Sequence, residues 1–193
     1  MTQGLIMVFP DVHGEHRDVE ACNAFVSDVK SFGPVRLVGL GDLLDCGGVF
    51  TSHARSYTNE MTESYEDDVA GANAFLDDVQ KAAPKAPIQL LEGNHEQRVE
   101  RWATCTFPNH KDAKMLLEKF GPEKALKMKD RGVRYYKRSE FHQGISIPGT
   151  MRIGKLFFTH GISFSANSAR VHLTRFGASV VYGHVHTPQS LVQ

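Results

Sequence analysis

The sequence lacks the features of membrane and secreted proteins. None of its apolar runs is long enough to span a bilayer. No basic segment precedes the apolar residues between Met1 and Pro10, as a secretory signal peptide would require. Its three cysteines are too few, and too irregularly spaced, for a zinc ribbon or a disulfide framework. We therefore expect a cytoplasmic protein with no membrane partner.

The charged residues are distributed unevenly along the 193-residue chain, although the formal net charge is zero. Residues 1–100 contain seven basic and 17 acidic residues, a net charge of −10, and residues 101–193 carry +10. An acidic half favours cation binding, and a basic half could bind a polyanion. Alternatively, the two halves neutralise each other within one folded domain.

The first half alternates strands with helices. Short aliphatic runs predict strands, and apolar residues at helical spacing predict helices between them. The expected strands are 5–9, 35–40 and 88–91, and the expected helices are 17–33 and 63–83. Between residues 46 and 59, glycine, serine, threonine and asparagine predict a long loop. Strand–helix–strand order indicates parallel pairing.

The second half begins with helices and then becomes rich in strands. Helices are expected at 96–104, 111–121 and 122–132, the last two ending at glycine. A second sheet is expected to contain strands 133–136, 145–147, 155–159 and 179–182, with a helix at 164–177. The fold class is therefore α/β, with two facing mixed sheets flanked by helices in one αββα sandwich.

Polar side chains follow five of the expected strands. They occur in the segments PDVHGE, GDLLDCGG, GNHE, THG and GHVH. Ligands of α/β sheets bind beyond the carboxyl ends of strands, so these segments are expected to meet there. The candidate ligands are carboxylates, one amide and imidazoles: Asp11, His13, Asp42, Asn94, His160, His184 and His186.

Oxygen and imidazole ligands without cysteine favour borderline-to-hard divalent cations over a structural thiolate zinc site. Seven ligands are too many for one ion, but they suit two ions about 3.5–4 Å apart that share a carboxylate. Such a pair activates a bridging water as hydroxide and clamps a displacement at phosphorus. We expect manganese, with iron, zinc, nickel and magnesium as alternatives.

These five blocks, in this order, resemble the calcineurin-like metallophosphoesterase superfamily over nearly the whole chain, from Asp11 to His186. The resemblance implies an αββα fold and phosphoester hydrolysis. It implies that Asp42 bridges two ions, with Asp11, His13 and His186 on one ion and Asn94, His160 and His184 on the other. It also implies that His95 is the general acid and that Asp45 orients it.

The sequence departs from the superfamily pattern in three ways. Residues 46–84 and 98–143 are longer than a minimal connection needs, and long loops near a site usually select substrate. Where its serine/threonine phosphatases have a phosphate-gripping arginine, this chain has Cys46. Arg98 and Arg101 are candidates for that role, and solvated helix arginines are the alternative. Only seven residues follow His186, whereas family members usually continue with further strands. We therefore expect a single domain, residues 1–193, that is either naturally short or truncated at its C-terminus.

The substrate is open among three classes. A phosphatase or phosphodiesterase of small or nucleotide-like substrates suits the compact size, and DVHG with GNHE suggests a protein phosphatase. A DNA or RNA nuclease would use the segment Lys111–Arg138, which carries ten basic and four acidic residues. A catalytically silent binding scaffold is the alternative outside enzymes. The sequence contains no motif that indicates an oligomeric state.

Overall fold

The computed structural model describes residues 4–47, 50, 64–107 and 109–192. Most of the loop expected between residues 46 and 59 lies outside the described residues, as does the first residue of the helix expected at 63–83. No helix that the structure describes is both long enough and apolar enough to cross a membrane.

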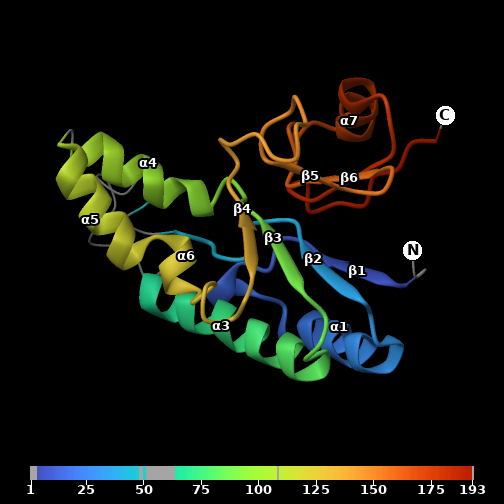
Figure 1. Cartoon of the computed structure of the whole chain (residues 1–193), viewed down its shortest axis with the longest axis horizontal. Helices are drawn as coiled ribbons and strands as arrows, with labels where there is room; N and C mark the ends of the chain where they lie inside the picture. Colours follow the sequence, from blue (N-terminus) through green and yellow to red (C-terminus); the bar gives the residue numbers. More distant parts are fainter. Residues whose placement is uncertain (1–3, 48–49, 51–63, 108, 193) are drawn as a thin grey trace.

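The first sheet is parallel and has the order β1-β2-β3-β4. Its strands are Ile6–Phe9, Arg36–Gly39, Ile88–Leu91 and Arg134–Tyr136. Helices α1 (Val19–Phe32) and α3 (Tyr65–Ala82) cover one face of this sheet (Figure 1). Both helices begin at a side-chain cap, because Asp18 and Ser64 accept hydrogen bonds from backbone N–H groups in the first turn.

The second sheet is mixed and has the order β5-β6-β7. Its strands are Thr150–Ile153, Leu156–Thr159 and Val180–Tyr182. Strand β6 pairs antiparallel with β5 and parallel with β7. Helix α7 (Ser168–Phe176) lies on the side of this sheet away from the first sheet (Figure 1). The expected α/β arrangement of two sheets flanked by helices is therefore confirmed, but the described strands of the first sheet are all parallel, so only the second sheet is mixed as expected.

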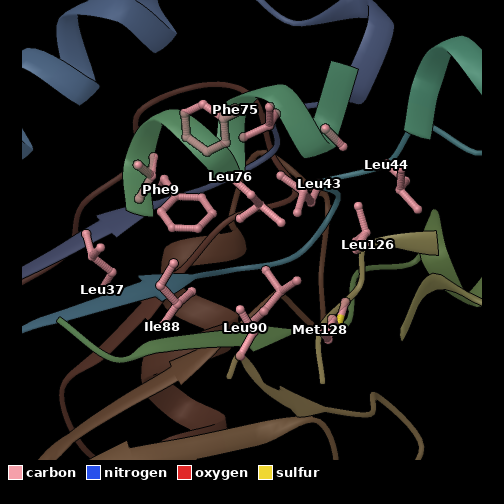
Figure 2. Close-up of a cluster of buried hydrophobic side chains, with 14 of the residues drawn as sticks. Phe9, Leu37, Leu43, Leu44, Phe75, Leu76, Ile88, Leu90, Leu126 and Met128 are labelled. Carbon is pink, nitrogen blue, oxygen red and sulfur yellow. The ribbon is translucent and has the colours of Figure 1, made fainter. Parts of the chain in front are cut away.

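Alternation along the first-sheet strands divides the core in two. Leu37, Ile88 and Leu90 point toward α3 and belong to the helix-side cluster drawn in Figure 2. Their neighbours Val38 and Leu91 point to the opposite face, in a second cluster with side chains of β4, β5 and β6. The two clusters therefore hold helices on one face of the sheet and the second sheet on the other.

Helices α4 (Glu96–Thr106), α5 (His110–Phe120) and α6 (Pro122–Ala125) connect β3 to β4. The helix expected at 122–132 was too long, because α6 has a single turn. Arg131 explains this, since its guanidinium donates to the carbonyl of Leu126 and to side chains of α3, which fixes the chain in a turn. Lys127 accordingly adopts a left-handed conformation, with φ of 52°.

The strands expected after residue 131 needed three corrections. Residues 134–136 form β4, which pairs with β3 in the first sheet instead of joining the second. Residues 145–147 form no strand, and β5 at Thr150–Ile153 was missed. Strand β5 forms a hairpin with β6 through Gly154, whose φ is 60°.

Candidate metal centre

The structure brings the polar segments of both sheets to one place. Asp11 and His13 follow β1, Asp42 and Asp45 follow β2, and Asn94 and His95 follow β3. His160 follows β6, and His184 and His186 follow β7. Strands β1 to β3 are parallel to one another, and β6 is parallel to β7, so within each sheet these segments leave from the same edge.

The ligand atoms form two groups of three, in each of which all the atoms lie within 4.8 Å of one another. The first group is Asp11, His13 and His186, and the second is Asp42, His160 and His184. In the first group, Nε2 of His13 lies 3.2 Å from Nε2 of His186. In the second, Nε2 of His160 lies 3.2 Å from Oδ2 of Asp42, and also 2.8 Å from Oδ1 of Asn94. All seven expected ligands are therefore close together.

Asp42 has the environment of a metal ligand. Its side chain is 1% exposed, and its Oδ2 atom is buried without a hydrogen-bond partner among the described residues. Two imidazole nitrogens lie near this oxygen, Nε2 of His160 at 3.2 Å and Nε2 of His95 at 3.7 Å. A buried carboxylate oxygen is rarely left without a partner, and a divalent cation would provide one here. The donor set and this oxygen both fit bound metal.

His13 and His160 are oriented by the nitrogen that faces away from the cluster. Nδ1 of His160 lies 3.0 Å from the carbonyl oxygen of Leu40, and Nδ1 of His13 lies 2.8 Å from Oδ1 of Asp45. A protonated Nδ1 donates in both contacts and leaves the Nε2 lone pair free. This tautomer is the one that a metal-binding imidazole needs.

The backbone of the site is strained. Five of the seven expected ligands have positive φ, a conformation that is costly for residues other than glycine: Asp11, His13, Asp42, His184 and His186. Such strain is typical of functional sites. Close packing adds a second constraint, because a Cβ atom on Gly93 would collide with Oδ1 of Asp42. This contact explains the glycine of the GNHE segment.

His95 lies at the rim of the cluster, at the start of α4. Its Nδ1 is 2.6 Å from the backbone carbonyl of Asp45 and 3.3 Å from the carboxylate of Asp45. Arg98, one turn later, donates to the same carbonyl and has Nη2 3.1 Å from Nε2 of His95. His95 also completes a third group of possible ligand atoms with His13 and Asp42.

Electrostatics favour the charged forms of Asp42 and Asp45, whereas burial raises the pKa of Asp11. Burial raises the pKa of Asp42, but contact with His160 and the charges of His160 and His95 outweigh it and lower the pKa to about 2. Hydrogen bonds to His13 and His95 hold the pKa of Asp45 well below its usual range. Burial lowers the pKa of His95, but Asp45 and the charge of Asp42 raise it more, so the net shift is upward.

Two buried carboxylates that support the site were missed in the sequence. Glu96 accepts hydrogen bonds from the backbone N–H groups of Asp42, Leu44 and Gly93, at 2.8–3.0 Å. It thereby joins the segment after β2 to the segment after β3. The sequence could have indicated this role, because Glu96 is the last residue of the polar segment GNHE.

Asp68 is the second of these carboxylates. It accepts hydrogen bonds from the backbone N–H groups of Asp45 and Cys46, at 3.0 and 2.9 Å. Its position in the sequence is unusual, because it continues the apolar stripe of α3 that includes Ala72, Phe75 and Val79. A carboxylate at helical spacing within an apolar stripe could have predicted this role.

The two candidate phosphate-binding arginines and Cys46 differ in their exposure. Arg98 is half-buried beside His95, whereas Arg101 is exposed. Cys46 is buried in the helix-side core, and desolvation raises the pKa of its thiol well above the usual value, so it is not a reactive group.

The basic segment Lys111–Arg138 does not form a uniformly solvated surface. Arg131 is 9% exposed and pairs with Asp77, and Lys137 pairs with Glu123. Arg138 is half-buried, and its Nη2 atom donates to the carbonyl of Gly161. The contacts of these three residues lie within the fold, and the structure gives no support to nucleic-acid binding by this segment.

Comparison with known proteins agrees with the geometry. Residues 4–188 match the family described as calcineurin-like phosphoesterase. Searches of the curated proteins and of the solved structures gave no match. The match covers both sheets and all five polar segments. The chain therefore belongs to the calcineurin-like phosphoesterase family, whose members hydrolyse phosphoesters with the help of metal ions.

Proposed function

We propose that the protein is a hydrolase of phosphoesters with two divalent cations, which Asp42 bridges. The observation that carries the proposal is the buried Oδ2 atom of Asp42, which has no hydrogen-bond partner among the described residues and lies 3.2 Å from Nε2 of His160. Asp42 belongs to both the His160 group and the group with His13 and His95. A shared carboxylate is what a two-metal site requires.

In this proposal, Asp11, His13 and His186 hold one cation, and Asn94, His160 and His184 hold the other. When bound, the cations supply an activated water and neutralise phosphate charge. Manganese suits the mixture of carboxylate, amide and imidazole, and iron, zinc, nickel and magnesium are alternatives that metal analysis distinguishes. Since both sheets supply ligands, we treat residues 1–193 as one catalytic domain.

His95 is the proposed general acid. Asp45 supports it through its backbone carbonyl, which lies 2.6 Å from Nδ1, and through its charge. Asp45 and the charge of Asp42 raise the pKa of His95 against the effect of desolvation, which is the direction that a general acid requires. Arg98 is positioned to hold a phosphate oxygen, because its guanidinium already lies at Nε2 of His95, where the leaving oxygen would be. Arg101 is exposed and gives the proposal no support.

Reconstitution of the metal-free protein tests the proposal. The protein is loaded separately with each of the five metals, bound metal is counted by mass spectrometry, and hydrolysis of p-nitrophenyl phosphate and its bis-ester is measured. Two bound ions and turnover are expected. One ion at saturation would contradict the bridged pair, and two ions without turnover on a wider phosphoester panel would favour a silent scaffold.

A pair of histidine variants gives the matched comparison. His13→Gln removes an expected ligand and should empty mainly one site. His16→Gln changes an exposed histidine three residues later and should keep both ions. Equal metal loss in both variants would indicate a general effect on folding.

A further inference from the structure

A cavity of 280 Å³ lies beside the metal centre. His160 forms part of its wall and is the only expected metal ligand that does so. Nε2 of His160 faces Asp42 and Asn94, so the cavity shares this one side chain with the metal centre. Its volume is slightly below the range of about 300–1,000 Å³ common for ligand pockets, so it suits a compact organic group.

Two arginines and several apolar side chains line the cavity. Arg138 follows β4, and Arg175 lies in the last turn of α7. Ile147, Pro148 and Ile162 provide apolar walls. Among the described residues, no carboxylate oxygen lies within 4.0 Å of either guanidinium. The cavity is therefore mainly apolar, and its wall includes two arginines that no acidic side chain of the described fold pairs with directly.

Arg138 is held in place by two hydrogen bonds, but one of its guanidinium nitrogens has no hydrogen-bond partner among the described residues. Its backbone N–H donates to Glu92 at 2.8 Å, and its Nη2 atom donates to the carbonyl of Gly161 at 3.1 Å. Its Nη1 atom is buried and has no hydrogen-bond partner in the described part of the chain. A buried charged donor without a partner is costly in free energy unless a ligand, ion or water satisfies it. The guanidinium of Arg138 therefore retains a donor that the described fold does not use.

We propose that this cavity binds the organic group of the substrate through an anionic substituent that Arg138 and Arg175 hold. The substrate class is thus a compact phosphoester that carries a second anionic group, either a carboxylate or another phosphoryl group. The inference rests on the proposed function, because it assigns the phosphoryl group to the metals and the second anion to the cavity. Guanidinium groups suit both anions, since each can accept two parallel hydrogen bonds.

Equilibrium binding tests the cavity without requiring turnover. The probes are benzylphosphonate, 4-carboxybenzylphosphonate and the corresponding 4-phosphono compound, titrated into manganese-loaded protein by calorimetry. The wild type should bind at least one substituted probe about 10- to 100-fold more tightly than benzylphosphonate, the range expected for a charged hydrogen bond, and the probe that binds more tightly identifies the second anion. The two substituted probes distinguish a carboxylate substrate from a bisphosphorylated one.

Three variants test whether Arg138 and Arg175 cause the tighter binding of the substituted probes. Arg138→Met and Arg175→Met should each reduce it to within about threefold, taking the charged hydrogen bond as the source of the preference. Arg170→Met changes an exposed arginine on the same helix as Arg175, outside this cavity, and should retain the preference. Arg175 is exposed, so its variant decides the matter if Arg138→Met does not fold.

Three outcomes of the binding experiment overturn the inference. No preference in the wild type, or a preference that survives both substitutions, would show that the cavity does not bind the second anion. Equal weakening of all three probes would place the arginines at the reacting phosphoryl group instead. Absence of p-nitrophenyl phosphate turnover by the wild type would count against the proposed function alone, because the binding preference is measured independently.

Discussion

Replacing Asp42 with asparagine tests the bridging carboxylate with little change of shape. In the metal-free protein, His160 and His95 lower the pKa of Asp42 from 3.8 to about 2, which corresponds to about 2–3 kcal/mol of stability. The introduced amide keeps an oxygen for the N–H of His95 and can donate to Nε2 of His160, which recovers about 1 kcal/mol. The metal-free variant should therefore lose about 1–2 kcal/mol, or about 2–8 °C in Tm.

The larger effect is expected on metal-induced stabilisation. At a metal concentration of about 100 times Kd, each bound ion adds about 2.7 kcal/mol, so two ions add about 5 kcal/mol. For a protein of this length, that corresponds to about 10–20 °C in Tm. If the loss of the shared charge raises both Kd values about 100-fold, the same metal concentration adds only about 1 kcal/mol, or about 2–4 °C.

Thermal melts with and without Mn²⁺, recorded at one pH, measure both the stability of the metal-free protein and the increase in Tm that metal produces. Asp28→Asn is the control, because Asp28 is an exposed residue of α1 and its variant should keep the full metal-induced shift. If Asp42→Asn kept the full shift and full turnover, the bridging role would be refuted. Loss of half the shift would mean that Asp42 binds only one ion.

Three further predictions concern catalysis, folding and partners. His95→Asn should keep both metals and lose about 10²–10⁴-fold in turnover of an alkyl phosphoester, but less with p-nitrophenyl phosphate, whose leaving group hardly needs a proton. Equal losses on the two substrates would contradict the acid role. Arg131→Met should lower the free energy of unfolding in urea by about 2–3 kcal/mol, because several charged hydrogen bonds are lost. The exposed Lys129→Met should not, and equal effects would argue against a special role for Arg131. If Lys111–Arg138 binds DNA, affinity should fall steeply with salt, and absence of binding at low salt would retire the nuclease hypothesis.

Strands β3 and β4 show which features of the fold could be predicted from the sequence and which could not. Its bounds, Ile88–Leu91, were predicted to the residue, because an apolar run ends sharply at polar GNHE. Strand β4 was placed in the wrong sheet, because three residues carry no local information about their partner. Its position depends on the packing of Tyr136 against Val38 and Leu91, and on the hydrogen bond from Gln89 to the hydroxyl of Tyr136.

The sequence by itself determined the chemistry of the site and the order in which its residues occur. Side-chain type is local information, so the carboxylates, the amide and the imidazoles could be read directly after their strands. Five polar segments in family order were enough to predict the fold class and the seven candidate ligands.

Only the tertiary structure decided which of these residues meet. Asp11 and His184 are 173 residues apart, yet the N–H of His184 donates to the carboxylate of Asp11. The sequence also did not show that Glu96 joins the segments after β2 and β3, or that Arg98 rather than Arg101 lies beside His95. Nor did it show that Arg138 and Arg175 line one cavity. Strand pairing and sheet packing bring these groups together, because such distances depend on contacts far apart in the chain.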